Sequence, residues 1–247
     1  MGKFFIAVIS ISFLIFSCHK DKPSENVQRI RINTIPTYNN LGSANLMLDS
    51  IYLTPEGYLI KFTDIKFYLS NIYSNQGRLK EACLFDLRDN GFLLLDTAAS
   101  SFDISSLFGI IGVDSSLNHL DPSAFANESP LNISNAGLMH WSWNTGYIFI
   151  NIEGKLDTIP NEITNLDHNF SFHVGMDSFT QNFEFNDLVW TQINDTLSET
   201  NFKLNMFELF HGQNSIDLKT EFLSHSGAGQ EALALKIAQN FKNSFSK

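Results

Sequence analysis

The sequence contains few cysteines and no long apolar segment, and each shortage excludes a class of protein. Only Cys18 and Cys83 occur among its 247 residues, which excludes a disulfide-rich scaffold. The most apolar segment, residues 4–16, is shorter than the roughly 20 residues that a membrane-spanning helix needs. The H-E-x-x-H, G-x-S-x-G, P-loop and dinucleotide-binding signatures are also missing. Hydrolase and NTPase functions therefore have no support, and we expect no enzymatic activity.

Basic residues are few compared with acidic ones. Lys and Arg total 16 against 26 Asp and Glu, which gives a formal net charge of −10 at pH 7. An acidic surface of this kind argues against nucleic-acid binding and against broad electrostatic adhesion to anionic lipid. Such a surface would mildly favour the binding of cations.

The N-terminus has the pattern of an export signal. A short positive region ends at Lys3, an apolar segment follows, and Ile15-Phe16-Ser17-Cys18 resembles a bacterial lipobox. The resemblance implies cleavage before Cys18 and lipidation of that residue, so that acyl chains anchor the protein in the cell envelope, on the periplasmic side or at the outer-membrane surface. The alternative is an ordinary secretory signal with a nearby cysteine. If Cys18 is acylated, Cys83 has no partner for an internal disulfide.

The rest of the chain has the pattern of an all-β protein. We expect a signal peptide over residues 1–17, a polar tether over 18–26, and one β-sandwich-like domain with long loops over 27–247. Short apolar runs that end at Asn, Gly, Asp or Ser predict the strands. These strands cover residues 27–34, 58–72, 82–87, 92–95, 146–153, 169–174, 183–190 and 202–210. Alternating phenylalanines such as Phe170 and Phe172 are expected to fill the inner faces of the sheets.

A long connection, residues 97–139, interrupts the strand pattern. It is rich in Ser and Asn around one apolar island at residues 107–113, and loops of this length inside a domain are more often functional than idle. Asp114, Asn118 and Asp121 offer oxygen ligands for calcium there. Their spacing is not that of an EF-hand, and solvated loop residues are the alternative interpretation.

The C-terminal segment predicts an amphipathic helix from Gly227 onward. Leu233, Ile237, Phe241 and Phe245 recur every four residues with polar residues between them, which is helical periodicity. We expect this helix to dock on the sandwich. A membrane-surface or partner-binding helix is the alternative.

Two tryptophans and a histidine stand immediately before a strand-like alternation. Trp141 and Trp143 are two residues apart and would project the same way if the extended backbone of Tyr147 and Phe149 began early, with His140 on the opposite face. The alternative is that both indoles fill the core and that His140 is a surface or hydrogen-bonded core residue.

The histidines are the remaining chemical resource. No two of the seven have close metal-ligand spacing, so a site would have to be assembled across the fold from His140, His173, His211 and His225. His173 and His211 each precede a glycine at a predicted strand end, where side chains converge on one rim. Imidazoles suit copper or zinc, and the lack of paired cysteines argues against a thiolate site. For each histidine taken singly, a structural role is the alternative.

Several segments, in order, resemble the MbnP-like family of periplasmic proteins. The most specific is the Trp-x-Trp-x-x-Gly-Tyr block that begins at Trp141. The resemblance runs from about residue 27 to the end of the chain, and it is carried by residues 61–72, 108–118, 139–147, 172–175 and 224–225.

This resemblance implies a copper protein. Copper-binding members hold the metal with histidines and with a tryptophan oxidised to kynurenine, an oxidation attributed to a MauG-like dihaem cytochrome peroxidase. His173 matches the family's Phe-His-hydrophobic-Gly motif and is the first expected ligand, while His140 stands where an aromatic residue is common. Trp143 is favoured over Trp141 as the modified residue.

Three functions follow as hypotheses. The first is an envelope-anchored lipoprotein that binds copper for acquisition or buffering. The second is a module that binds a peptide, glycan or outer-membrane receptor without metal. The third is an oxidation substrate or accessory of the haem peroxidase.

Overall fold

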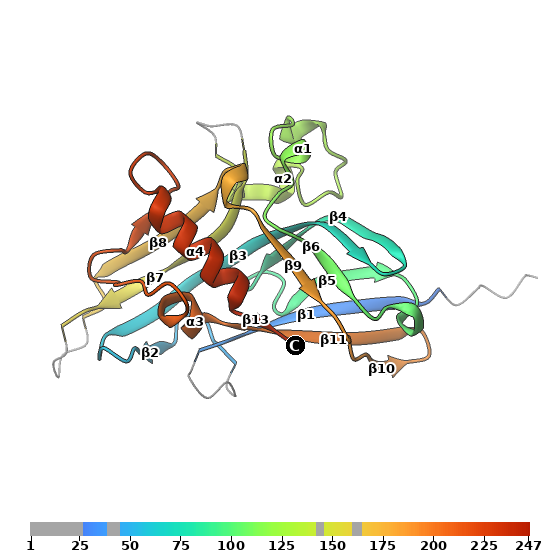
Figure 1. Cartoon of the computed structure of the whole chain (residues 1–247), viewed down its shortest axis with the longest axis horizontal. Coiled ribbons are helices and arrows are strands. Elements are labelled where there is room, and N and C mark those ends of the chain that lie inside the picture. The colour runs from blue at the N-terminus through green and yellow to red at the C-terminus, as the bar shows by residue number, and fades with distance from the viewer. Residues whose placement is uncertain (1–26, 39–44, 142–145, 160–164) are drawn as a thin grey trace, which may run out of the picture.

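Two β-sheets and the helix α4 (Glu231–Asn243) make up most of the fold (Figure 1). The computed structural model describes residues 27–38, 45–141, 146–159 and 165–247. In Figure 1, α4 crosses in front of the larger sheet, and the smaller sheet runs along the lower edge of the view. The mostly strand architecture confirms the all-β prediction.

The smaller sheet is built on β1 (Arg29–Thr37). This strand pairs in parallel with β11 (Leu197–Asn205) and antiparallel with β5 (Leu93–Ala98). Two short strands, β10 (Thr191–Asn194) and β13 (Phe245–Ser246), also pair with β11. Alternation along β1 buries Ile30 and Ile32 and leaves Arg31 between them at the surface, as expected for a strand with one covered face.

The larger sheet is centred on the long strand β3 (Leu59–Ser74). In the described part of the chain, four strands of this sheet pair antiparallel with β3. The sheet order is β12 (Leu223–Ser224), β8 (His168–Gly175), β7 (Ile148–Asp157), β3, β6 (Leu107–Ile111) and β9 (Gln181–Phe185), with β2 (Ile51–Leu53) and β4 (Gly77–Asp86) also on β3.

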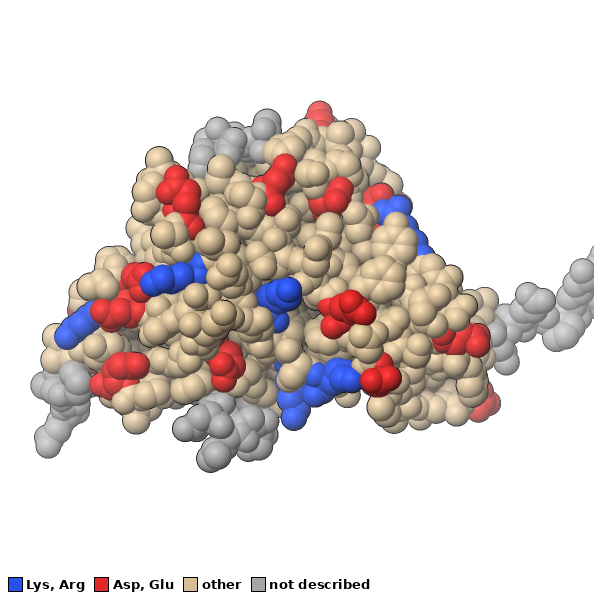
Figure 2. Space-filling view, in the orientation of Figure 1, with Lys and Arg blue, Asp and Glu red and all other residues tan. Residues whose placement is uncertain are grey.

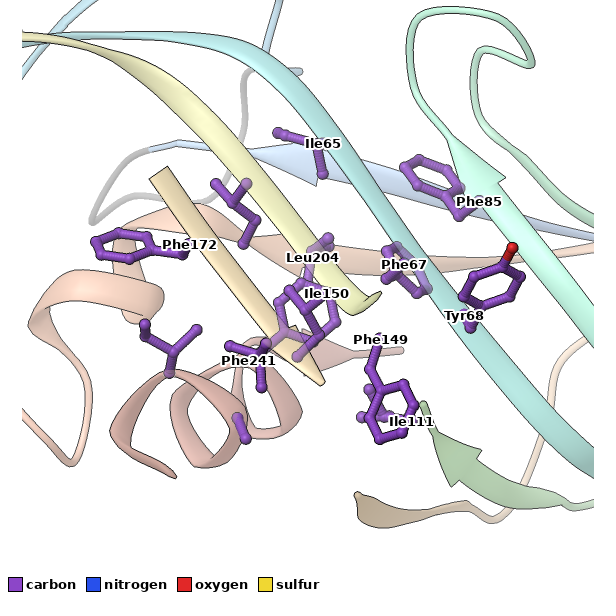
Figure 3. Close-up of a cluster of buried hydrophobic side chains, with 14 of the residues drawn as sticks. Ile65, Phe67, Tyr68, Phe85, Ile111, Phe149, Ile150, Phe172, Leu204 and Phe241 are labelled. Atoms are coloured by element: carbon purple, nitrogen blue, oxygen red, sulfur yellow. The ribbon is translucent and has the colours of Figure 1, made fainter. Parts of the chain in front are cut away.

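One continuous core joins the two sheets and α4. Buried side chains come from β3, β7 and β8 in the larger sheet, from β11 in the smaller sheet, and from α4. Figure 3 shows Phe67, Ile150, Phe172, Leu204 and Phe241 pointing toward one another from these elements. The face of the larger sheet that meets this core is called the inner face below, and the opposite one the outer face.

The predicted C-terminal helix docks on the sheets, as expected. Ile237 and Phe241 on α4 are fully buried, and the ring of Phe241 lies 5.1 Å from that of Phe67. The helix ends at Asn243, before Phe245, which instead belongs to β13. Its ring nevertheless packs edge-on against Phe67 and Phe241, so the apolar spacing correctly identified a core residue but not its backbone conformation.

Two strand predictions extend too far. The segment 202–210 leaves the sheet at Asn205, whose side-chain oxygen accepts from the Phe207 N–H and caps α3 (Met206–His211). The segment 183–190 leaves it at Phe185, and the indole of Trp190 donates to the Ile104 carbonyl at 2.7 Å. At Asn205 a local side-chain hydrogen bond ends a strand that apolar content alone would continue, whereas the Trp190 bond reaches a segment 86 residues away.

The long connection is largely structured. Its apolar island forms β6, and the remainder covers one end of the outer face, where α1 and α2 lie together in Figure 1. Tyr68 donates from its hydroxyl to the Pro130 carbonyl at 3.0 Å, and Tyr147 does the same to Leu131. The short helices here are η1 (Ser101–Asp103), α1 (Ser115–Asn118), η2 (Pro122–Ala124), α2 (Ile133–Ala136) and η3 (Gly137–Met139), and a further one, η4 (Asp177–Phe179), follows β8.

Among the described residues, no helix is both long and apolar enough to span a bilayer. On the face shown in Figure 2, acidic side chains are scattered among basic ones and do not form one patch. The acidic balance of the sequence is thus spread over this surface.

Candidate functional site

A row of polar side chains crosses the outer face of the larger sheet. Along β8, Phe172 and Val174 are buried in the core, so the alternating residues Ser171 and His173 face outward. The register places Asn151 of β7 directly opposite His173. This polar row begins where the cover provided by the long connection ends.

His173 and His225 stack on each other. Strand β12 pairs in parallel with β8 and brings the following residue, His225, alongside His173. The two rings are 4.7 Å apart between centroids and inclined by 17°. Ser226 fixes this arrangement, because its hydroxyl donates to the His173 carbonyl at 3.2 Å and accepts from the Gly175 N–H at 3.1 Å.

Glu153 determines which nitrogen of His173 is free. A carboxylate oxygen of Glu153 lies 2.7 Å from Nε2 of His173, and the Ser171 hydroxyl lies 3.2 Å from the same nitrogen. Donation from Nε2 to the carboxylate leaves Nδ1 as the nitrogen with an available lone pair. The same hydrogen bond holds the pKa of Glu153 below its ordinary value of 4.5, so the carboxylate stays ionised.

His225 favours its neutral form. Burial lowers its pKa below the ordinary 6.5, and the nearby charge of His173 lowers it further, whereas Glu153 acts in the opposite direction. A neutral imidazole keeps a lone pair for an electrophile or a metal ion. His225 therefore keeps a nitrogen lone pair near neutral pH.

The polar row continues across β7, β3 and β4. Asn151 donates to Asp64 at 2.9 Å, and the Lys66 ammonium lies 2.9 Å from Asp86 and 3.5 Å from Asp64. Burial raises the pKa of Asp64, although Lys66 opposes this shift. Among the described residues, neither Oδ1 of Asp64 nor Oδ1 of Asn151 has a hydrogen-bond partner. The row is thus polar and charged, with Lys66 paired to two of its carboxylates.

Trp141 adjoins the histidine pair. Its side chain is buried, with only 6% exposed, and its ring packs on Gly175 so closely that a Cβ there would overlap it. Gly175 lies two residues beyond His173 and on the same outer face of β8. The backbone N–H of Trp141 donates to the Gly146 carbonyl at 3.1 Å, and the neighbouring His140 forms an isolated antiparallel bridge with Tyr147. Strand β7 begins at Ile148, so it does not extend back to Trp141, which was the condition for the two indoles to project the same way.

A surface hollow with a volume of about 360 Å³ adjoins Trp141. Asp177 is held on its wall by two neighbours: Nε2 of His119 lies 3.0 Å from one carboxylate oxygen, and Asn118 donates to the other at 2.7 Å. Asn118 also accepts from the Tyr147 N–H at 2.8 Å. The hollow is lined by Asn118, His119, Trp141, Gly146, Met176, Asp177 and Ser178.

Sequence reasoning did not select His119 or Asp177 as site residues. The available signals were weak, because His119 stands alone in the long connection and Asp177 follows the Phe-His-Val-Gly segment by only two residues. The pairing of η4 with α1 across the end of β8 brings them together, and sequence spacing does not report that contact.

His140 and His211 do not join the pair. His140 packs edge-on against Tyr147, 5.0 Å between centroids, and burial lowers its pKa. His211, at the end of α3, has Nδ1 3.4 Å from Glu56 and stacks near Phe207. The expected convergence of His173 and His211 on one rim is wrong, because α3 packs on the inner face, where Phe210 contacts the rings of β8, whereas His173 lies on the outer face.

The described residues contain no group of three His, Cys, Asp or Glu side chains arranged to hold a metal ion. The proposed calcium ligands Asp114 and Asp121 instead cap α1 and η2, accepting from the backbone N–H groups of Ser116 and Ser123. Trp143 and Cys18 lie outside the described residues.

Two of the comparisons with known proteins found a match, one to a family model and one to a solved structure. The family model described as MbnP matches residues 27–228. Among solved structures, the chain is similar to MbnP from Methylosinus trichosporium, with 13% identity, a TM-score of 0.53, and coverage of 85% of this chain and 87% of that one. At this identity the likeness shows the fold alone. No curated protein matches the chain.

Proposed function

Because the chain belongs to the MbnP family, whose model spans residues 27–228, we propose that it is a copper-binding protein of the bacterial cell envelope. The observation that carries this proposal is the stacked pair of His173 and His225 beside the buried Trp141. Its role would be copper acquisition or buffering.

The donor chemistry fits copper. Imidazole nitrogen is a good copper ligand, and the carboxylate of Glu153 orients His173 as outer carboxylates orient metal-bound histidines. Imidazoles suit zinc as well as copper, and the described residues bring together two of them. The choice of copper therefore rests on the MbnP family and not on the number of ligands.

An oxidised tryptophan would supply an additional donor. Two equivalents of peroxide would open the indole to N-formylkynurenine with release of water, and hydrolysis would then release formate and leave kynurenine, which carries an aromatic amine and a carbonyl. A MauG-like dihaem cytochrome peroxidase is the proposed partner that uses the peroxide. Trp141 borders both His173's strand and the open hollow, and Trp143 remains the other proposed target.

The envelope location is proposed from the N-terminal sequence. Cys18 follows an apolar export signal and would carry the lipid anchor. Residues 18–26 would then hold the folded domain away from the membrane.

A copper titration of the full chain tests the ligands. We expect His173→Ala and His225→Ala each to weaken copper affinity by at least about tenfold, the equivalent of roughly 1.4 kcal/mol. His168→Ala is the matched control, because this histidine also lies on β8 but its side chain is 70% exposed and distant from the stacked pair along the strand. Unchanged affinity in both ligand variants would reject the pair as the copper site.

Native mass spectrometry of protein purified from its own host's envelope tests the remaining parts together. The intact mass reports the lipid on Cys18, any bound copper and any conversion of Trp141 or Trp143 to kynurenine. Unmodified tryptophans without metal would reject the copper function and favour a binding module on the same fold.

A further inference from the structure

A second concave surface lies on the outer face at the opposite part of the larger sheet. We call it the aromatic groove. Its volume is about 840 Å³, and strands β3, β6 and β9 form its floor. It is lined by Asn71, Tyr73, Phe108, Gly109, Ile110, Asn182, Phe183, Glu184 and Lys242.

A β-bulge in β3 creates the groove's main feature. Ser70 pairs with Ile110 and Tyr73 pairs with Phe108, so three steps along β3 match two steps along β6. In a regular strand Ser70 and Tyr73 would face opposite sides, but the extra residue places both on the outer face. Asn71 absorbs the irregularity with a φ of 49°, a left-handed conformation that Asn tolerates better than most residues.

The bulge is supported by a glycine on the neighbouring strand. A Cβ on Gly109 would lie 2.9 Å from the Ser70 carbonyl oxygen, 3.0 Å from that of Asn71 and 3.1 Å from the Phe183 ring. The bulged backbone therefore approaches β6 in a way that only glycine permits. Asn71 and Gly109 thus permit the bulge that directs the Tyr73 side chain outward.

Tyr73 and Phe108 together form an aromatic platform. The rings of Tyr73 and Phe108 are stacked with a 9° angle and a centroid distance of 5.8 Å, and Phe108 is 40% exposed. Exposed aromatic surface at the centre of a concave site is typical of ligand binding. Bulges likewise occur often beside binding sites, where they redirect a side chain.

Polar groups form the rim. Glu184 lies directly opposite Phe108 on β9, Asn182 lies opposite Ile110, and Lys242 approaches from α4. One carboxylate and one ammonium cancel in formal charge, and the amides both donate and accept hydrogen bonds. The rim therefore suits a ligand that is polar and neutral.

We propose that the aromatic groove binds a neutral oligosaccharide. A pyranose ring has an apolar C–H face that would pack on Phe108 and Tyr73, and hydroxyl groups at its edge that pair with amides and a carboxylate. A protein partner is less well matched, because interfaces of that class are centred on larger desolvated contacts. The groove shares no lining residue with the copper site, so the two proposals are independent.

Calorimetric titration of the full chain with cellohexaose, maltohexaose and chitohexaose tests the proposal. We expect saturable binding of at least one hexasaccharide, weakened by about tenfold in Phe108→Ala because the stacking surface is lost. Phe102→Ala is the control, since this phenylalanine is 91% exposed but lies outside the groove. Near-UV circular dichroism verifies that each variant is folded.

Asn182→Ala keeps the aromatic pair and tests the rim separately. We expect it to weaken saccharide binding as well. His173→Ala is expected to leave saccharide binding unchanged, which separates this result from the copper measurement. Absence of binding to all three hexasaccharides, or equal affinity in Phe108→Ala, would overturn the proposal. Loss of association with a protein partner in Phe108→Ala, without saccharide binding, would instead assign the groove to protein docking.

Discussion

At the residue scale, His173 illustrates how a neighbouring carboxylate can prepare a ligand. A histidine whose two nitrogen atoms are both engaged within the protein has a purely structural role. Here both described partners, Glu153 and Ser171, contact Nε2, so the hydrogen bonding is concentrated on one nitrogen. This asymmetry leaves Nδ1 for the proposed copper ion and favours the ligand role over the structural role that the sequence alone left open.

Glu153→Gln tests that role without removing a proposed ligand. Glutamine keeps an oxygen near Nε2 but loses the charge that raises ligand basicity, so we expect copper affinity to fall by roughly 10- to 100-fold. Competition against a chelator of known affinity measures the change. Glu184→Gln, on β9 outside the copper site, serves as the control. An affinity equal to that of the unmodified protein would show that Glu153 does not tune His173.

Gly175 is the residue on which the position of Trp141 depends. A methyl group there would overlap the indole ring and approach the Tyr147 carbonyl, so Gly175→Ala is expected to lower the free energy of unfolding by about 1–3 kcal/mol. Urea denaturation measures the loss, and a shifted tryptophan emission would report displacement of Trp141. Gly227→Ala provides the comparison, because no atom lies within 4 Å of a Cβ at that position. Equal stability of the two variants would contradict the packing argument.

At the element scale, the long buried strands were predictable and the short ones were not. The segment 58–72 corresponds closely to β3, and 169–174 lies within β8, because burial on one face imposes a period of two. β10 is exposed along its whole length, and β12 and β13 have two residues each, so they carry no usable periodicity. α3 was missed because it follows β11 without a break in apolar content.

The candidate site was predictable only in part for a related reason. His173 stood out in its motif, but its neighbour His225 is brought alongside by the parallel pairing of β12 with β8. Pairing between distant segments leaves no trace in local periodicity. The same limitation concealed the contact of His119 with Asp177, and it made His140 and His211 appear equivalent to the other two.

Helix α4 is expected to stabilise the protein through the face that it buries against the sheets. Phe241 is fully buried against Phe67, whereas Leu235 on the same helix is 40% exposed. Phe241→Ala should lower the free energy of unfolding by about 3–5 kcal/mol, and Leu235→Ala by less than about 1 kcal/mol. Urea denaturation of both variants makes the comparison. Similar losses would indicate that α4 is not seated on the core as described.

At the scale of the whole molecule, three histidines whose pKa is lowered should make the folded protein less stable as the pH falls. Burial lowers the pKa of His140, His211 and His225 below 6.5. The unfolded chain therefore binds more protons than the folded one just below pH 6.5. The contribution of these histidines to the free energy of unfolding is fully present above pH 6.5. It is lost as the pH falls through their pKa values in the folded protein. Glu153, with its lowered pKa, adds a further loss below about pH 4.5. Asp64, whose pKa is raised, opposes it.

His211 allows this account to be tested on one group. Its Nε2 is buried and without a hydrogen-bond partner among the described residues, and its pKa is lowered by burial although Glu56 and Glu208 act in the opposite direction. The free energy of unfolding should therefore fall between about pH 7 and pH 5, and His211→Gln should reduce that slope because glutamine does not titrate. Urea denaturation at a series of pH values measures the slope, which is independent of any constant loss caused by the substitution. His168→Gln, which replaces an exposed histidine, should leave the slope unchanged. An unchanged slope in His211→Gln would mean that protonation of His211 does not oppose folding, and the acid sensitivity between pH 7 and pH 5 would then belong to His140 and His225.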